Sequence, residues 1–190
     1  MDSTRSRIAS ATAELHATIG PAQTTIKAVA ERAGVQRHTV YSHFPDMSSL
    51  IRACTEHTLR VTGMPTSDGW SAIDDPVRRL EHGLTELYGY YRANSSMVRT
   101  VLRDIDFMLR TGGVEEYIDR MGGMFVALGA GWPGDESSQQ LRGAAVAHAL
   151  AFDTWRSFAD HGINDEDIRS LMVRLVTTIE PPLAVAPSRL

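Results

Sequence analysis

Cysteine is nearly absent from this chain, and long apolar segments are missing altogether. Cys54 is the single cysteine among 190 residues, so no internal disulfide can form and a disulfide-stapled secreted domain is excluded. No run of about eighteen apolar residues occurs, which argues against a membrane-spanning helix. The segment MDSTRSRIAS lacks the apolar core of a secretory signal. Together these features predict a cytoplasmic protein with no membrane partner.

Strand patterns, internal repeats and low-complexity segments are also scarce. Apolar residues recur at three- and four-residue spacing through nearly the whole chain, which is typical of amphipathic helices. Hydrophobic residues make up 43% and charged residues 22% of the chain, which is ordinary for a globular protein and argues against disorder. The predicted fold class is therefore all-α, with one or two domains for this length.

Recognisable catalytic motifs are missing too. The chain has no glycine-rich phosphate loop, no G-x-S-x-G and no H-E-x-x-H. His38 and His43 are five residues apart and do not share a helix face, and Asp104 and Asp106 point in different directions on a helix. We therefore expect neither an enzyme nor a metal or other cofactor, and keep a small all-helical enzyme as an alternative.

Charge is unevenly distributed along the chain. Residues 1–60 hold seven Lys or Arg and five Asp or Glu, a net charge of +2, whereas the remainder carries twelve basic and eighteen acidic residues, a net charge of −6. A mildly basic N-terminal part followed by an acidic body is compatible with nucleic-acid binding, although an excess of two charges is a weak indication by itself.

The first sixty residues have the layout of a helix-turn-helix. Apolar spacing predicts a first helix that ends at Gly20-Pro21 and a short second helix whose apolar residues stand at 26, 29, 30 and 33. Thr24 or Thr25 is placed to cap the second helix, and Gly34 can end it in a left-handed conformation. A third helix is expected over residues 36–44, and Asp46 can cap a fourth.

The predicted third helix has a polar outward face. At about 100° per residue, Phe44 falls on the same inward side as Val40, whereas His38 and Ser42 fall opposite. The second helix of a helix-turn-helix enters the major groove, where an arginine such as Arg37 can pair with guanine O6 and N7. Simple solvation remains the alternative for each polar residue taken singly. The candidate DNA-binding residues are Thr24, Thr25, Gln36, Arg37, His38, Thr39, Tyr41, Ser42 and His43.

The stretch TTIKAVAERAGVQRHTVYSHFPDMSSL resembles the N-terminal signature of tetracycline-repressor-type (TetR family) regulators. The matching residues are Thr25, Val29-Ala30, Ala33-Gly34-Val35, Thr39-Val40-Tyr41, Phe44 and Leu50, within about residues 5–52. The family commonly has a phosphate-binding lysine at the start of the fourth helix, where this chain has Met47. We therefore expect slightly weaker phosphate anchoring. The resemblance implies a DNA-binding domain over residues 1–60 and a ligand-binding and dimerisation domain over residues 61–182. The last segment, PPLAVAPSRL, begins with two prolines, and we expect a disordered tail over residues 183–190.

Residues 62–75 are rich in Gly, Pro, Ser and Asp and are expected to form a connecting segment. The sequence after this segment predicts further helices. Apolar stripes mark five helical segments, at residues 77–91, 98–109, 114–128, 141–155 and 168–179.

Large side chains on these stripes are candidates for an effector pocket, because aromatic and methionine side chains can line adaptable apolar cavities. Core packing is the alternative for each of them, and His148 in particular is either a ligand contact or a buried core histidine. Arg103 and Asp106 are spaced as a surface pair or as contacts to a polar ligand. The candidate ligand-binding residues are Tyr88, Tyr91, Met108, Tyr117, Met121, Phe125, His148, Phe152 and Trp155.

Alanines at 144, 145, 147, 149 and 151 permit close helix approach, and the last helix has a full apolar stripe. We therefore expect a homodimer through the last two helices, which would read a palindromic double-stranded DNA operator. The predicted function is a transcriptional repressor that a small-molecule effector of unknown identity releases from its operator. An effector-independent helix-turn-helix protein is the main alternative.

Overall fold

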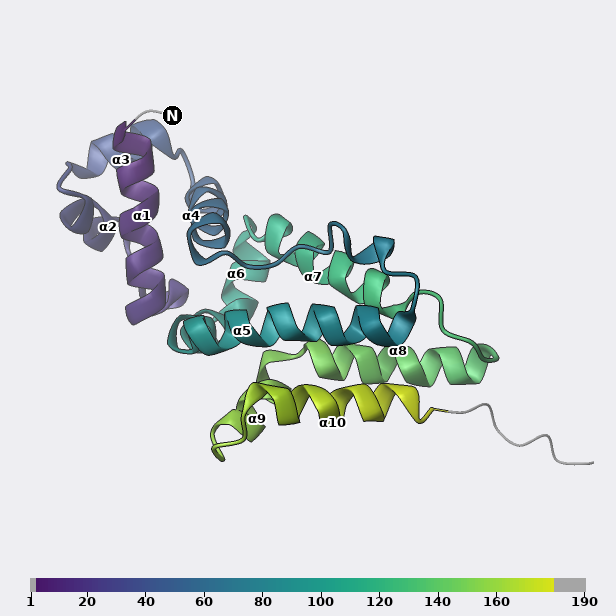
Figure 1. Cartoon of the computed structure of the whole chain (residues 1–190). Coiled ribbons are helices and arrows are strands. Elements are labelled where there is room, and N and C mark those ends of the chain that lie inside the picture. The colour runs from purple at the N-terminus through teal and green to yellow at the C-terminus, as the bar shows by residue number, and fades with distance from the viewer. Residues whose placement is uncertain (1–2, 180–190) are drawn as a thin grey trace, which may run out of the picture. The chain divides into compact units, whose positions relative to one another are not determined.

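The computed structural model describes residues 3–179, and every regular element within them is helical. Short 3₁₀ helices, η1 and η2, connect α1 to α2 and α4 to α5 (Figure 1). None of these helices is both long enough and apolar enough to cross a membrane. The elements are α1 (Ser3–Thr18), η1 (Pro21–Gln23), α2 (Ile26–Ala33), α3 (Arg37–His43), α4 (Met47–Thr62), η2 (Trp70–Ala72), α5 (Pro76–Arg103), α6 (Ile105–Thr111), α7 (Glu115–Gly129), α8 (Glu136–Leu150), α9 (Phe152–Ala159) and α10 (Asp165–Thr177).

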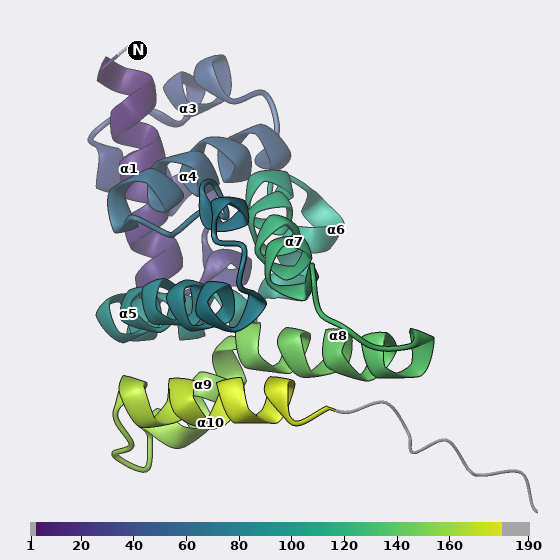
Figure 2. The ribbon, with the colours of Figure 1, turned by 45° about the vertical axis from the view of Figure 1, so that its right-hand side comes forward.

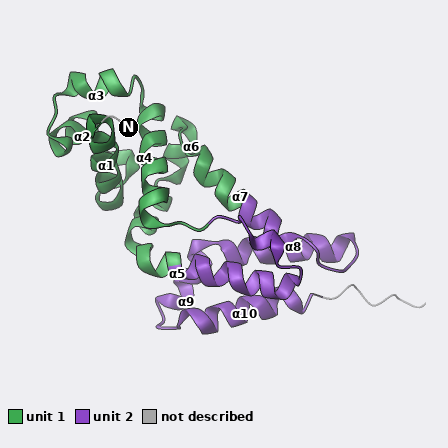
Figure 3. Cartoon of the chain, turned by 45° about the horizontal axis from the view of Figure 1, so that its top comes forward, with its two compact units in different colours: residues 1–65, 90–122 green, residues 66–89, 123–190 purple. Residues whose placement is uncertain are grey.

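The chain forms two compact units, coloured separately in Figure 3. Unit 1 consists of residues 1–65 and 90–122, and unit 2 of residues 66–89 and 123–190. Helices α5 and α7 each contribute residues to both units. The predicted division at residue 60 separates a DNA-binding from a ligand-binding domain, whereas the two units are defined by contacts, so that division stays a prediction. The predicted disordered tail lies outside the described residues.

The N-terminal four helices of unit 1 enclose a small apolar core. Ile8 of α1, Val29 of α2 and Val40 of α3 are completely buried, and Leu50 of α4 joins them. Helix α1 packs against both α2 and α4, and α3 packs against α2. The inward stripe predicted from apolar spacing therefore matches the observed core, because each of these helices exposes its polar face and buries its apolar face.

Unit 1 also contains the second half of α5 and the helix that follows it. The predicted helix over residues 98–109 is wrong as a single element, since α5 ends at Arg103 and α6 begins at Ile105. Asp104 has φ −104° and ψ 16°, and its carboxylate accepts a hydrogen bond from the backbone N–H of Ala22 at 3.1 Å. A contact with a distant part of the chain thus accompanies the break in the helix.

Unit 2 is built on α8 and α10, which pack against each other and run side by side in Figures 1 and 2. The phenolic O–H of Tyr88 donates to the carbonyl of Ala149 at 2.9 Å, which joins α5 to α8. The predicted single helix over 141–155 is wrong, because the chain becomes extended at Ala151 and begins α9 at Phe152. No glycine or proline marks this break, so apolar spacing alone could not reveal it.

Candidate nucleic-acid interface

The bounds of α2, and with them the start of the turn to α3, follow directly from the two residues that cap this helix. Thr25 caps α2, since its hydroxyl oxygen accepts a hydrogen bond from the N–H of Ala28 at 3.1 Å. Gly34 ends the helix in a left-handed conformation, with φ 64° and ψ 41°. A side chain there would be strained even though no neighbouring atom would touch it. The two helices are thus fixed by local chemistry that the sequence already predicted.

The outward face of α3 carries the polar side chains expected of a recognition helix. Val40 and Phe44 are buried, which anchors the helix on the core. Gln36, Arg37, His38 and Ser42 are exposed, Tyr41 is 55% exposed, and Thr39 and His43 are half-buried. The hydroxyl of Ser42 donates to the carbonyl of Thr39 at 2.8 Å, and Thr39 lies 3.5 Å from a ring nitrogen of His38. The structure therefore brings these seven candidates together on α3 and its N-cap.

Arg37 stands out from the other cations near this face. Lys27 lies 3.8 Å from the carboxylate of Glu31, and Arg32 forms an ion pair with Glu14. No ion pair to Arg37 is found among residues 3–179, so its guanidinium is available to an external partner. A planar guanidinium with several donors suits either the edge of a guanine or a phosphate.

The two threonines before α2 have different environments. Thr24 is only 6% exposed, and its hydroxyl donates to the carbonyl of Gly20 at 2.8 Å. Thr25 is exposed at the N-terminus of α2. A phosphate contact is therefore sterically open to Thr25, whereas Thr24 would first have to leave its buried position.

Arg5 supports the end of α3, a role that the sequence did not predict. Its guanidinium donates to the carbonyl of His43 at 2.6 Å and lies 4.3 Å above the ring of Phe44. These contacts join the start of α1 to the end of α3, which are thirty-eight residues apart. No local pattern points to such a pairing, so only the folded chain reveals it.

Met47 occupies the first position of α4, where a lysine was expected from the resemblance. The side chain is half-buried and packs against the core of the N-terminal four helices and against a second apolar cluster formed by Ile51, Met108 and Val114. Asp46 caps the helix by accepting from the N–H of Ser49 at 2.7 Å, and these hydrogen bonds lower the pKa of its carboxyl. Met47 thus has a packing role in place of a charged contact.

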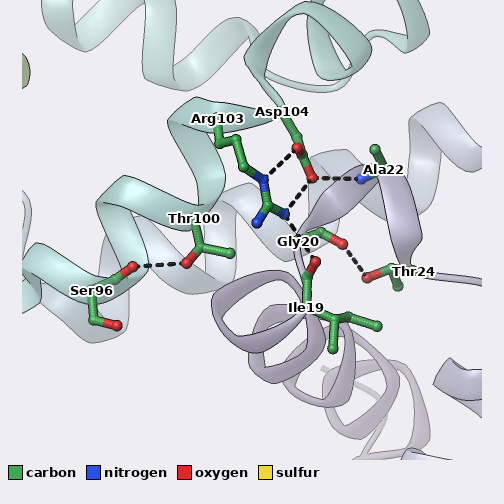
Figure 4. A network of polar contacts seen from close by, with 8 residues as sticks. All are labelled: Ile19, Gly20, Ala22, Thr24, Ser96, Thr100, Arg103 and Asp104. Carbon is green, nitrogen blue, oxygen red and sulfur yellow. Dashed lines mark hydrogen bonds and ion pairs between the residues drawn. The ribbon is translucent and has the colours of Figure 1, made fainter.

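A clamp joins the end of α5 to the segment that precedes α2 (Figure 4). The guanidinium of Arg103 donates to the carbonyl of Ile19 at 3.0 Å, and Asp104 accepts from the N–H of Ala22. Arg103 and Asp104 also pair with each other at 2.9 Å, which lowers the pKa of the Asp104 carboxyl and raises that of the guanidinium. Of the two roles expected for Arg103 and Asp106, the surface pair is replaced by the pairing of Arg103 with Asp104, and the contact to a polar ligand stays a prediction.

Unit 1 contains a cavity of about 70 Å³ between α1, α4, α5, α6 and α7. Tyr91, Met108 and Tyr117, three of the predicted effector-binding residues, line it. His16 of α1 and Cys54 of α4 also line it, and neither was predicted as a ligand contact. Their side chains meet at 3.4 Å between Nδ1 and Sγ.

Burial keeps His16 and Cys54 uncharged. The pKa of His16 falls from 6.5 to about 4, mainly because burial penalises the imidazolium, although the negative charge of Asp104 opposes the shift. Burial raises the pKa of the Cys54 thiol to about 12. The cavity wall therefore offers a neutral imidazole and a protonated thiol near pH 7.

The other predicted effector contacts do not line this cavity. Met121 is half-buried in unit 1, whereas Phe125 and His148 are exposed in unit 2, where His148 lies 3.2 Å from the hydroxyl of Thr154. Tyr88 is buried, and the rings of Phe152 and Trp155 pack 5.6 Å apart in unit 2. Their assignment to an effector site stays a prediction, and core packing accounts for Tyr88, Phe152 and Trp155.

Comparison with known proteins supports the interpretation of the N-terminal helices. The family model described as bacterial regulatory proteins, tetR family, matches residues 8–54. One solved structure, described as a TetR-family transcriptional regulator from Rhodococcus sp., aligns over 93% of this chain and 98% of its own with 18% identity and a TM-score of 0.62. A mutant of the HlyIIR protein aligns over 92% of this chain and 97% of its own with 15% identity and a TM-score of 0.64. A search of curated proteins finds no match.

Proposed function

This chain belongs, through its N-terminal domain, to the tetR family of bacterial regulatory proteins, and we propose that it is a repressor released from a palindromic operator by a small molecule. DNA binding and transcription regulation come with the family, whereas the repressor role, the effector and the operator symmetry are parts of the proposal. The observation that carries it is the exposed polar face of α3, with Arg37 free of acidic partners within residues 3–179.

The proposed DNA contacts divide into base readout and phosphate anchoring. Arg37 and His38 are the proposed base-reading residues, because they are the exposed donors nearest the start of α3, the end of a recognition helix that contacts base edges. Thr25, with the N-terminus of α2, is proposed to bind a phosphate, because free backbone N–H groups there favour an anion. Tyr41 is proposed to bind a second phosphate through its exposed hydroxyl.

The proposed homodimer forms through the segments predicted as the last two helices, 141–155 and 168–179, whose main helices in the structure are α8 and α10. Leu141 on α8 and Leu171 and Leu175 on α10 are exposed to different degrees, at 60%, 37% and 41%. Leu171 and Leu175 are four residues apart and so share one helix face. Exposed leucines on adjacent helices are the kind of surface that a second copy of the chain would cover, and a two-fold dimer would match two operator half-sites.

The proposed effector site is the cavity of unit 1, because three predicted ligand contacts line it and helix α1 of the DNA-binding part forms one of its walls. Effector-independent DNA binding is the second candidate. It is favoured by the cavity volume of about 70 Å³, which is well below the range of about 300–1,000 Å³ of typical small-molecule sites. An effector would therefore have to be compact or to widen the cavity on binding.

Titration of DNA from upstream of the protein's own gene tests the proposal. Fluorescence anisotropy should show binding that is specific for sequence and weakens steeply as salt rises, because Lys and Arg contacts release counterions from phosphates. Equal and weak binding to every sequence would contradict the repressor. A small molecule that lowers affinity tenfold needs only about 1.4 kcal/mol of preference for the DNA-free state.

A further inference from the structure

We propose that the cavity of unit 1 binds a compact, uncharged molecule with an apolar body and one hydrogen-bond acceptor, which Nε2–H of His16 holds. This inference rests on the proposed function, since it names the class of effector and the residue of the DNA-binding part that would contact it.

The wall of the cavity is mostly apolar and carries no charged side chain among the described residues. None of the described residues that line it is an Asp, Glu, Lys or Arg. Val98, Met108 and Val114 are buried apolar examples from three different parts of the wall. Asp104, whose negative charge acts on His16, is outside the lining and is paired with Arg103. An anionic or cationic ligand would lose its hydration in the cavity without gaining an unpaired opposite charge, which costs several kcal/mol or more. The wall therefore selects against charge.

The polar atoms of the wall form a chain that ends at the imidazole of His16, and the proposal assigns the tautomer of that imidazole. Thr58 is hydrogen-bonded to the sulfur of Cys54, and Cys54 in turn lies 3.4 Å from Nδ1 of His16. The thiol keeps its proton because burial raises its pKa to about 12. It can therefore donate to Nδ1, which places the ring proton on Nε2. In this tautomer Nε2–H is a donor, which the proposal directs at the ligand, so the ligand has to carry an acceptor.

Size limits the ligand further. A dry apolar cavity of about 150 Å³ can hold one benzene molecule, whereas this cavity measures about 70 Å³. Met97 and Met108 line it, and unbranched methionine side chains adapt more readily than branched ones. A molecule of one aromatic ring, or an aliphatic body of similar size, would fit after these two side chains move.

A matched series of one-ring compounds tests both charge and acceptor on the full-length protein. Isothermal titration should detect saturable binding of p-cresol, weaker binding of toluene by about fivefold or more, and no binding of benzoate or benzylammonium at the same concentrations. Binding of either ion as tightly as p-cresol would overturn the proposal. Failure of both neutral compounds would overturn it as well.

Two kinds of variant then locate the site. His16→Leu should abolish the preference for p-cresol over toluene while leaving toluene binding within about twofold, whereas a purely structural role of His16 would weaken both alike. Val98→Phe should fill the cavity and remove binding of both compounds, and Val101→Phe, at a half-buried wall position, repeats the test if the first variant fails to fold. The exposed Val126→Phe is the control that should bind normally. Normal binding in the folded cavity variants would contradict the assigned site.

Operator titrations separate this inference from the proposed function. If p-cresol binds the cavity without changing operator affinity, the ligand class stands and effector control fails. If a charged compound instead binds and lowers operator affinity, effector control stands and the ligand class proposed here fails.

Discussion

Gly20 and Arg103 lie so close that a Cβ atom on Gly20 would overlap the Arg103 guanidinium and the Asp104 carboxylate (Figure 4). Gly20 also has φ 97°, a conformation that other residues rarely adopt. The Arg103 guanidinium can reach the carbonyl of Ile19 because Gly20 has no side chain that would occupy the same space. A residue without a side chain is therefore needed at the point where α5 is clamped to the segment that leads into α2.

Gly20→Ala is expected to destabilise the protein by about 2–3 kcal/mol, because backbone strain adds to the displacement of Arg103 and Asp104. Urea unfolding followed by circular dichroism measures the change. Gly63→Ala is the comparison, since Gly63 has φ 65° and ψ 37° with no atom near the added Cβ and reports the strain of a left-handed backbone alone. The φ 97° and ψ 155° of Gly20 are less accessible to alanine, so part of any excess loss at Gly20 is backbone strain. Equal losses in the two variants would show that the clamp contributes nothing to stability.

Arg37→Ala is expected to weaken operator binding by about 1–3 kcal/mol and to relax the preference at one base pair. The physical reason is that its guanidinium is exposed and lacks an acidic partner within the described residues. Anisotropy on a set of operators with single base-pair changes measures both effects. Arg110→Ala, another exposed arginine, serves as control on α6. An unchanged pattern of base preference would remove Arg37 from base readout.

Arg5→Met is expected to weaken binding to all operator variants by a similar factor, without changing which bases are preferred. Arg5 holds the end of α3 through the carbonyl of His43 and the ring of Phe44, so its loss would loosen the whole proposed recognition helix. We expect a stability loss of about 1–2 kcal/mol from the hydrogen bond and the cation–π contact. A selective effect at one base pair would instead indicate that Arg5 itself contacts DNA.

The features that the sequence predicted well are those set by neighbouring residues. The Gly34 turn, the Asp46 cap and the burial of Val40 and Phe44 all follow from backbone preferences or helical spacing over a few residues. The all-helical fold follows for the same reason, since apolar periodicity is a local property that persists along the chain.

The features that escaped prediction depend on residues far apart in sequence. Arg5 meets His43, and His16 meets Cys54, across thirty-eight residues in each case. Asp104 meets Ala22 across eighty-two residues, and the helix breaks at that contact. Periodicity within one segment carries no information about such pairs. Tyr91 could therefore be predicted as a residue of the cavity wall, whereas His16 could not.

Acid is expected to destabilise the protein through His16. The pKa of His16 is about 4 in the folded chain and 6.5 as an ordinary value, so between these pH values the unfolded chain binds a proton that the folded chain does not. The free energy of unfolding therefore falls as pH drops from about 6.5 to about 4, by up to about 3 kcal/mol from this group.

Urea unfolding between pH 4 and 7.5 measures this dependence. Because carboxyl groups also titrate at the acid end, the comparison is with His16→Gln, in which the part of the slope due to His16 should disappear. His161→Gln makes the same substitution at an exposed histidine and is the matched variant for comparison. Identical slopes in wild type and His16→Gln would mean that the imidazole is not buried in solution.

The proposed dimer predicts that Leu171→Glu combined with Leu175→Glu gives a monomer. In a two-fold dimer each substitution is present on both sides of the interface. The unpaired carboxylates buried there should weaken dimerisation by more than about 3 kcal/mol, or over 100-fold in dissociation constant. Light scattering at several protein concentrations measures the mass. The circular dichroism spectrum should remain that of a helical protein, because the side chains of Leu171 and Leu175 are already partly exposed within one chain.

The matched control is Val61→Glu, which places the same charge on an apolar position of α4 that is 67% exposed. It should remain dimeric, because the proposed interface involves only α8 and α10. The monomeric variant should also bind a single half-site about as well as wild type does, yet lose the tight binding to a complete palindrome, since only a dimer gains the second recognition helix. A dimer that survives both glutamates would move the interface to another face.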